Sequence, residues 1–185
     1  MLDSTQLKKG TVFTQDGRTY LVLDYKHVKK GRGLATIRVK VKDVENGSIV
    51  EKTFSSNEKV ESAEIEYKSA QFLYSDDEHS FFMDSSDYSQ FQISIKDIKW
   101  QGKFLVEGAK LKTIWLKDKI IGVEIPKKVT LKVADTGPGT AGDTVTNAMK
   151  EAELETGYIL QVPLFVNNND SIVVNTENGN YVSKG

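Results

Sequence analysis

The stretch YLVLDYKHVKKGRGLATIRVKVKDV, residues 20–44, has the pattern of a β-hairpin with a cationic turn. In the arm after the turn, ATIRVKVK (residues 35–42), apolar residues alternate with polar or cationic ones. Because a period of two places neighbouring side chains on opposite faces of a strand, this arm is predicted to be half-buried with a cationic outer face. The preceding run, residues 19–28, is rich in β-branched and aromatic residues, and the glycine-containing loop between the runs predicts a hairpin.

The hairpin also concentrates positive charge. Between Tyr25 and Lys42 there are seven Lys or Arg residues and no Asp or Glu, in a chain of formal net charge −1. Such a local concentration usually faces a polyanion, although exposed strand edges also carry Lys to prevent edge pairing. At the tip, Gly31 and Gly33 flank Arg32, so a long side chain projects from a narrow turn. From charge alone we favour contact with nucleic acid over edge decoration.

Short segments with a period of two continue through most of the 185 residues and are separated by turn signals such as Asn46-Gly47 and Asn178-Gly179. This spacing predicts an all-β chain of small barrels or sandwiches. We expect boundaries near residue 64 and at Pro126, which gives domains over 1–64, 65–126 and 127–185. Domains of this size are small for independent stability and are expected to pack end to end or to share interfaces. Two stretches could contain short helices: part of SQFQISIKDIKWQGKFLVEG (residues 89–108) and NAMKEAELE (residues 147–155).

Several kinds of site are not expected. The chain has no Cys, which excludes disulfides, thiolate metal sites and Cys nucleophiles. His27 and His79 have no companions at metal-ligand spacing, so no metal site is expected. MLDSTQLKKG lacks the apolar run of a signal peptide and no stretch of 18 apolar residues occurs, so we expect a cytoplasmic protein without a membrane partner.

One string suggests catalysis. Asp135-Thr136-Gly137 follows an apolar strand pattern and resembles the aspartic-protease motif, in which two carboxylates share a proton. A single copy would need a homodimer, and a turn-forming Asp at a strand end is the favoured interpretation. The longer loop DTGPGTAGDT, residues 135–144, has no Lys after its glycines and is not a phosphate-binding P-loop.

Three segments carry a family resemblance: HVKKGRGLATIRVKVKDVENG (27–47), VEIPKKVTLKV (123–133), and the block from ADTGPGTAGDT to NYVSKG (134–185). Through them the chain resembles bacterial translation elongation factor P, and in its first two domains the hypusine-bearing eukaryotic initiation factor. The resemblance implies an SH3-like KOW barrel at 1–64 and OB folds at 65–126 and 127–185, in an elongated, tRNA-like arrangement. It also implies a cytoplasmic monomer, neither an enzyme nor dependent on a cofactor, that binds both ribosomal subunits beside the peptidyl-tRNA and relieves stalling at consecutive prolines.

The resemblance assigns residue roles as well. Arg32, at the loop tip, would reach the peptidyl transferase centre, at the position where relatives carry a modified Lys or a rhamnosylated Arg, so an enzyme that modifies Arg32 is a further partner. This chain has Lys30 where the Lys type has Pro, and Gly33 where the Arg type usually lacks Gly, so an unmodified Arg32 remains open. The other implied RNA and small-subunit contacts are Lys26, Lys29, Lys30, Gly31, Gly33, Arg38, Lys40, Lys42, Gly142, Asp143, Thr144 and Tyr181.

The competing hypothesis is a free single-stranded RNA-binding OB-fold protein. Such proteins stack bases on aromatic side chains that are interleaved with the basic face. The hairpin offers only Tyr20 and Tyr25 for this purpose, which makes this alternative the weaker one. The acidic turn Asp76-Asp77-Glu78 is expected to face solvent or protein, because RNA would repel it.

Overall fold

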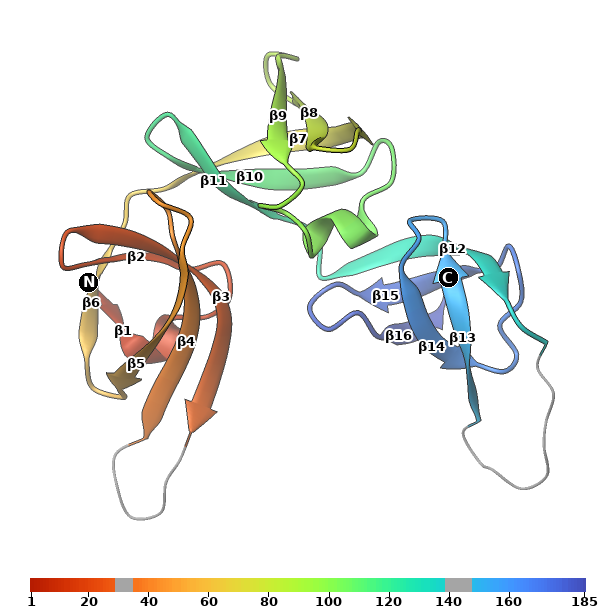
Figure 1. The fold of residues 1–185 in the computed structure, drawn as a ribbon, viewed down its shortest axis with the longest axis horizontal. Coiled ribbons are helices and arrows are strands. Elements are labelled where there is room, and N and C mark those ends of the chain that lie inside the picture. The colour runs from red at the N-terminus through yellow and green to blue at the C-terminus, as the bar shows by residue number, and fades with distance from the viewer. Residues whose placement is uncertain (29–34, 139–147) are drawn as a thin grey trace. The chain divides into compact units, whose positions relative to one another are not determined.

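The computed structural model describes residues 1–28, 35–138 and 148–185, and its regular elements are almost all β-strands (Figure 1). The exceptions among the described residues are two short 3-10 helices, η1 (Ser4–Gln6) and η2 (Gln101–Phe104). The strands form three sheets of six, five and five strands. The prediction of an all-β chain built from small strand domains is confirmed. Within the described ranges, no helix has the length and hydropathy needed to cross a bilayer.

The first sheet has the strand order β1-β6-β2-β3-β4-β5. Its strands are β1 (Leu2–Asp3), β2 (Val12–Gln15), β3 (Arg18–Val28), β4 (Thr36–Asp43), β5 (Ile49–Ser55) and β6 (Lys59–Ser62). The buried core of this sheet includes Phe13, Ile37 and Phe54. The expected alternation in β4 is observed, since Ile37, Val39 and Val41 are fully buried while Arg38 and Lys40 are exposed.

The second sheet has the order β11-β10-β7-β8-β9, and the third has the order β14-β13-β12-β15-β16. The second consists of β7 (Glu66–Ser75), β8 (His79–Asp84), β9 (Gln90–Ser94), β10 (Lys110–Leu116) and β11 (Lys119–Glu124). The third consists of β12 (Lys128–Thr136), β13 (Met149–Leu154), β14 (Ile159–Pro163), β15 (Ser171–Asn175) and β16 (Tyr181–Lys184). Each sheet therefore uses a contiguous part of the sequence.

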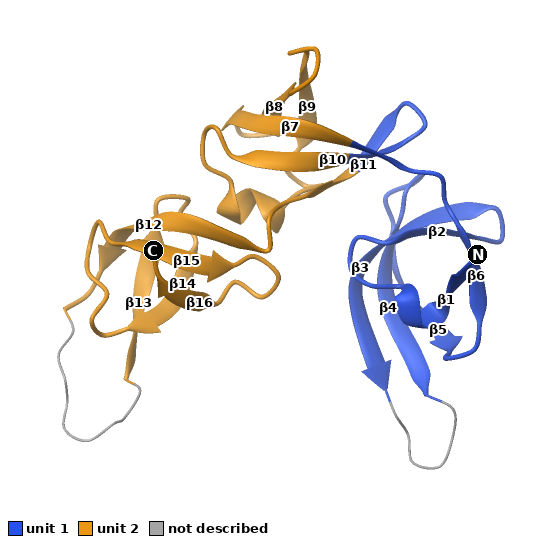
Figure 2. Ribbon diagram, turned by 180° about the vertical axis from the view of Figure 1, so that it is seen from behind, with its two compact units in different colours: residues 1–67, 114–121 blue, residues 68–113, 122–185 orange. Residues whose placement is uncertain are grey.

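The chain forms two compact units, and the smaller one consists of residues 1–67 together with 114–121 (Figure 2). The second segment is the end of the β10–β11 hairpin. Its Ile114 and Ile121 are buried in a cluster with Val12, Leu21 and Val44 of the first sheet. Residues from a later part of the sequence therefore cover the apolar side chains Val12, Leu21 and Val44 of the first sheet. This arrangement is favourable because it buries apolar surface.

The larger unit consists of residues 68–113 and 122–185. Phe104 of η2 is 1% exposed and lies in the hydrophobic cluster of the third sheet, beside residues such as Leu131 and Val162. The indole Nε1 of Trp100 donates a hydrogen bond to the carbonyl oxygen of Thr176 at 2.7 Å. The core of the third sheet therefore includes an aromatic side chain from outside residues 127–185. The domain boundaries after residues 64 and 126 stay a prediction.

The short helix considered possible at NAMKEAELE is not found where the structure describes this stretch, because Met149–Leu154 form strand β13. Ala152 and Leu154 are buried and Glu151 and Glu153 are exposed, which is the period of a strand. Helix propensity in this segment is overridden by pairing with β12 and β14. The other helical stretch was partly right: it contains η2, but it also contains strand β9.

Candidate nucleic-acid interface

The predicted interface is the β3–β4 hairpin, and the structure describes its two arms. The turn, with Lys29, Lys30, Gly31, Arg32 and Gly33, lies outside the described residues. The remaining predicted contacts of this hairpin, Lys26, Arg38, Lys40 and Lys42, lie on the arms. These four side chains make up the described part of the predicted interface.

The arms are fixed from below by the core of the first sheet. In β4, the inward residues Ile37, Val39 and Val41 have no exposed surface. Under them, the rings of Phe13 and Phe54 meet edge to face with centroids 5.8 Å apart. Full burial of these side chains supplies most of the stabilisation of the hairpin, so the outward residues can be polar.

A β-bulge in β3 decides which way Lys26 points. The pairing of β3 with β4 shifts by one residue between Val22 and Asp24. Without this shift, Lys26 would lie opposite the buried Ile37; with it, Lys26 lies opposite the exposed Arg38. Directly paired residues of neighbouring strands share one face of a sheet, so the bulge places both cations on the outer face.

The end of the hairpin near the turn has the highest density of positive charge among the described residues of the arms. Lys26 and Arg38 are directly opposite each other, and the next strand contributes the neutral Thr53 to the same row. Like charges in such a pair repel and destabilise the sheet. An arrangement that costs stability in the isolated protein is favourable when both cations contact a phosphate backbone.

Further from the turn, carboxylates lie among the cations. Lys40 is opposite Asp24 on β3 and opposite Glu51 on β5. Lys42 is partly buried and is opposite Leu21 and Ile49. The run without acidic residues that is visible in the sequence is therefore interrupted in space at Lys40. Neither Asp24 nor Glu51 was singled out from the sequence, because only the strand register brings them beside Lys40.

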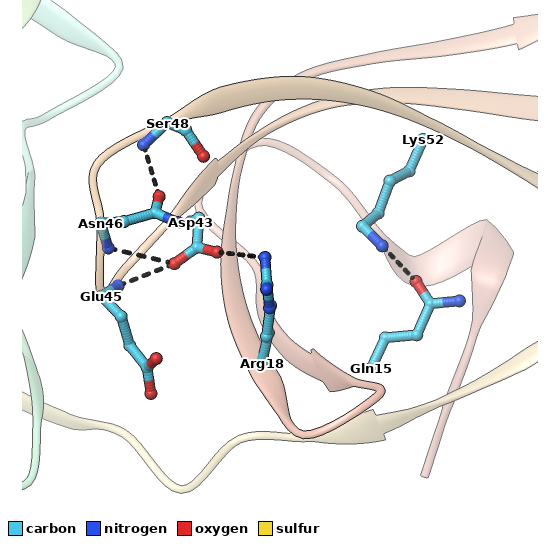
Figure 3. Close-up of polar contacts among 7 residues, drawn as sticks. All are labelled: Gln15, Arg18, Asp43, Glu45, Asn46, Ser48 and Lys52. Carbon is cyan, nitrogen blue, oxygen red and sulfur yellow. Dashed lines mark hydrogen bonds and ion pairs between the residues drawn. The ribbon is translucent and has the colours of Figure 1, made fainter.

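A turn at the opposite end of β4 anchors the hairpin, and Asp43 organises it (Figure 3). Asp43 is 2% exposed, and its Oδ1 accepts hydrogen bonds from the backbone N–H groups of Glu45 and Asn46 at 2.9 and 3.3 Å. Its Oδ2 lies 3.7 Å from the guanidinium of Arg18. Gly47 has a φ of 74°, a conformation that glycine adopts at little cost and that closes the predicted Asn-Gly turn. These contacts fix the end of the arm from which the cationic strand extends.

The two tyrosines of the hairpin do not lie on its outer face. Tyr20 is buried in the core of the first sheet, where its ring contacts Phe13 and lies 4.3 Å from the ammonium of Lys52. Tyr25 packs partly against the same core. Neither ring is placed to stack on a base at the cationic face. This observation weakens the hypothesis of single-stranded RNA binding at this hairpin, since such binding needs exposed aromatic platforms beside the cations.

In the third sheet, Gly142, Asp143 and Thr144 lie outside the described residues. The described residues that border this loop are held by polar contacts: the ammonium of Lys150 donates to the Gly137 carbonyl at 2.8 Å, and the backbone N–H of Thr136 donates to Oδ1 of Asn168 at 2.7 Å. Tyr181, the fourth predicted contact of this region, is half-buried against the core of the third sheet.

Two acidic sites have structural roles that the sequence only suggested. Asp76 accepts hydrogen bonds from the backbone N–H groups of His79 and Glu78, and these bonds hold its pKa below the ordinary value. Asp135, the protease candidate, is exposed and accepts a hydrogen bond from the Asn168 amide at 3.2 Å. Asp76 therefore stabilises a turn, and Asp135 makes a polar contact near the end of a strand. The second finding agrees with the favoured interpretation of Asp135 as a turn-forming residue at a strand end.

Comparison with known proteins gives matches along almost the whole chain. Residues 3–60 match the KOW-like domain of elongation factor P (EF-P), residues 65–123 match its OB domain, and residues 129–184 match its C-terminal domain. Among solved structures, the chain is similar to eukaryotic translation initiation factor 5A from Methanococcus jannaschii, with 23% identity, a TM-score of 0.39, and coverage of 68% of this chain and 90% of that one. It is also similar to a translation initiation factor eIF-5A family protein from Naegleria fowleri ATCC 30863, with 14% identity, a TM-score of 0.36, and coverage of 67% and 96%.

Proposed function

Because the chain belongs to the elongation factor P family and is a translation elongation factor, we propose that it binds the ribosome beside the peptidyl-tRNA and stimulates peptide-bond formation at consecutive prolines. The observation that carries this proposal is the outward pairing of Lys26 with Arg38 at the end of the arms that lead to Arg32. The two cations of such a pair repel each other in the free protein, whereas both are attracted to a phosphate backbone.

The arms of the hairpin would bind phosphates, and the tip would position the acceptor end of the tRNA. Lys26, Arg38 and the cations of the turn contribute affinity for phosphates that depends on salt but carries no sequence information. Arg32 would reach the acceptor end of the tRNA, where its planar guanidinium bonds phosphate or ribose oxygens and stacks on a base. The modifying enzyme that relatives imply would act on the same side chain.

The rate effect needs no chemical group from this chain. Proline reacts slowly in peptide transfer because its ring fixes φ and restricts how the nascent chain and the attacking amine approach each other. Restoring a near-attack geometry is worth several kcal/mol in model reactions, on the order of 7–11 kcal/mol at the upper end. We therefore propose a positioning factor rather than an enzyme, acting in the cytoplasm as a monomer. Gly142, Asp143 and Thr144 would contact the small subunit, and Tyr181 the body of the tRNA.

The test is translation of a reporter with consecutive prolines in a reconstituted system, comparing the parent chain with Arg32→Ala. We expect the variant to fold normally and to lose the relief of stalling. Arg32→Lys separates the two properties of the side chain, since it keeps the charge but not the planar fork. Lys59→Ala is the matched control, because Lys59 is an exposed strand cation of the same sheet and lies opposite Asp3. Full relief by Arg32→Ala would remove the tip from the mechanism.

A further inference from the structure

The outer face of the β13–β14 hairpin is unlike the β3–β4 face. Its outward positions form three cross-strand pairs: Met149 with Pro163, Glu151 with Gln161, and Glu153 with Ile159. Met149 is 47% exposed and Ile159 is 56% exposed. Exposed apolar side chains at both ends of one face of a sheet indicate an interaction surface. We call these six paired residues the β13–β14 face.

The charge on this face is negative. Glu151 lies in the row between Met149 and Ile159, Glu153 is paired with Ile159 itself, and β12 adds Asp135, which pairs directly with Glu153. The outward positions of β13 and β14 include no Lys or Arg. The Lys of β13, Lys150, lies opposite the buried Val162, and its ammonium donates to the Gly137 carbonyl. A phosphate backbone would be repelled here, whereas a cationic partner would be attracted.

We propose that the β13–β14 face binds an extended, basic segment of a ribosomal protein that presents an apolar side chain on each side of a Lys or Arg. The three outward pairs are spaced two residues apart along the strands, about 6.6–6.8 Å. Alternate side chains of an extended segment have the same spacing, so an apolar, basic, apolar sequence at positions i, i+2 and i+4 would place its apolar side chains at Met149 and Ile159 and its basic side chain at Glu151. Apolar contact at the ends excludes water from the central ion pair and strengthens it.

This inference rests on the proposed function for the location of the partner, since it takes the ribosome as the place where the chain acts. The residues of the β13–β14 face are all different from the residues on which the proposed function depends. The cations of the β3–β4 hairpin would face RNA, while the β13–β14 face would select against RNA through carboxylates. A single translation factor would then contact the ribosome through two surfaces of opposite charge.

Because the chain has no cysteine, a single introduced cysteine can be labelled at one known position. Gln161→Cys places one thiol at the centre of the β13–β14 face, where a benzophenone label crosslinks whatever lies within a few ångströms. Tyr88→Cys is the matched control, since Tyr88 is 70% exposed on the second sheet's β8–β9 turn. The labelled full chain is bound to ribosomes and irradiated, binding is measured separately by sedimentation, and crosslinked peptides and nucleotides are identified by mass spectrometry.

We expect the label at residue 161 to crosslink to a Lys- or Arg-containing protein segment with apolar neighbours at alternate positions, and the label at residue 88 not to do so. Crosslinks from residue 161 to ribosomal RNA would overturn the inference, as would a ribosome-bound chain that forms no crosslink there above the control. A chain that does not sediment with ribosomes would overturn the proposed function, and this inference with it. The two failures are thus distinguishable.

A charge reversal gives a second, independent readout. The double variant Glu151→Lys with Glu153→Lys should weaken ribosome binding at low salt by about tenfold or more, because two attractions become repulsions. The matched control is Asp77→Lys with Glu78→Lys, which changes the net charge by the same amount on an exposed turn of the second sheet. If both double variants bind ribosomes equally well, the face is not a docking surface for a basic segment.

Discussion

The β3–β4 hairpin of the first unit and the β13–β14 hairpin of the second are built in the same way and present opposite surfaces. Both bury one face in a hydrophobic core and expose the other. On the exposed side, the first hairpin has Lys26 opposite Arg38, whereas the second has Glu153 between Asp135 and Ile159. In each case two like charges lie in one row at some cost in stability. In both hairpins the buried residues stabilise the fold. The exposed residues would determine which kind of partner can bind.

The largest expected effect comes from the buried side of either hairpin. Ile37→Ala in the first and Leu154→Ala in the second should each lower the free energy of unfolding by about 2–5 kcal/mol, because a cavity is left in a packed core. The outward neighbours Arg38→Ala and Glu153→Ala should change it by less than about 0.5 kcal/mol. Urea denaturation of the four variants measures this. Equal losses of unfolding free energy for the inward and outward variants would contradict the conclusion that the buried residues stabilise both hairpins.

The next effect is on ribosome binding and separates the cations of the first hairpin from each other. Removing Lys26 and Arg38 together should reduce the slope of log affinity against log salt by about 1.4–1.8, if each contacts one phosphate. Lys40→Ala should reduce the slope by less than half as much, since Asp24 and Glu51 lie opposite it. Binding to ribosomes at four or more salt concentrations gives the slopes. A slope change for Lys40→Ala as large as half that of the double variant would contradict the role given to the register.

A smaller effect sets stability against binding. Lys26→Glu places a carboxylate opposite Arg38, so the chain should become more stable by about 0.2–1 kcal/mol while its affinity for ribosomes falls. Glu153→Lys does the same for the other hairpin, because it places a cation opposite Asp135. Thermal denaturation with ribosome sedimentation measures both quantities for both variants. A loss of stability in either variant would show that the row of like charges does not cost what its geometry implies.

The smallest expected effect concerns acid stability in the second unit. The Lys184 ammonium lies 2.8 Å from Asp170 and, with the Asn167 N–H, holds the pKa of Asp170 below its ordinary value. A carboxyl whose pKa is lowered on folding contributes stability above its unfolded pKa, and this contribution is lost as the pH falls through the folded pKa. Asp170→Asn should therefore weaken the loss of stability below about pH 4.

Lys184→Met should have a similar but smaller effect on the same acid limb, and the double variant should differ little from Asp170→Asn alone, because both changes remove one interaction. Denaturation midpoints between pH 2 and 6 test this. An acid limb that is the same in all four proteins would show that the ion pair does not contribute.

Much of the architecture followed from periodicity. The alternation in residues 35–42 predicted which side chains of β4 are buried, and Asn46-Gly47 predicted its turn. The family resemblance was found in the sequence and is confirmed by three domain matches. The sequence left the structure of NAMKEAELE open, because residues that favour a helix lie there in a strand between two others. It gave no signal for Phe104, whose place in the core of the third sheet depends on a segment from outside residues 127–185.

The amino-acid sequence by itself determined which residues alternate, where the chain turns and which family it resembles, because these depend on neighbours along one strand. The tertiary structure alone decided what lies beside each exposed residue. Lys26 faces Arg38 only because a bulge shifts the register, and Lys40 has two carboxylates opposite it only because β3 and β5 flank β4. The pairing of strands is a long-range choice made by burial and backbone hydrogen bonding, and it is this choice that converts a run of charges into a surface.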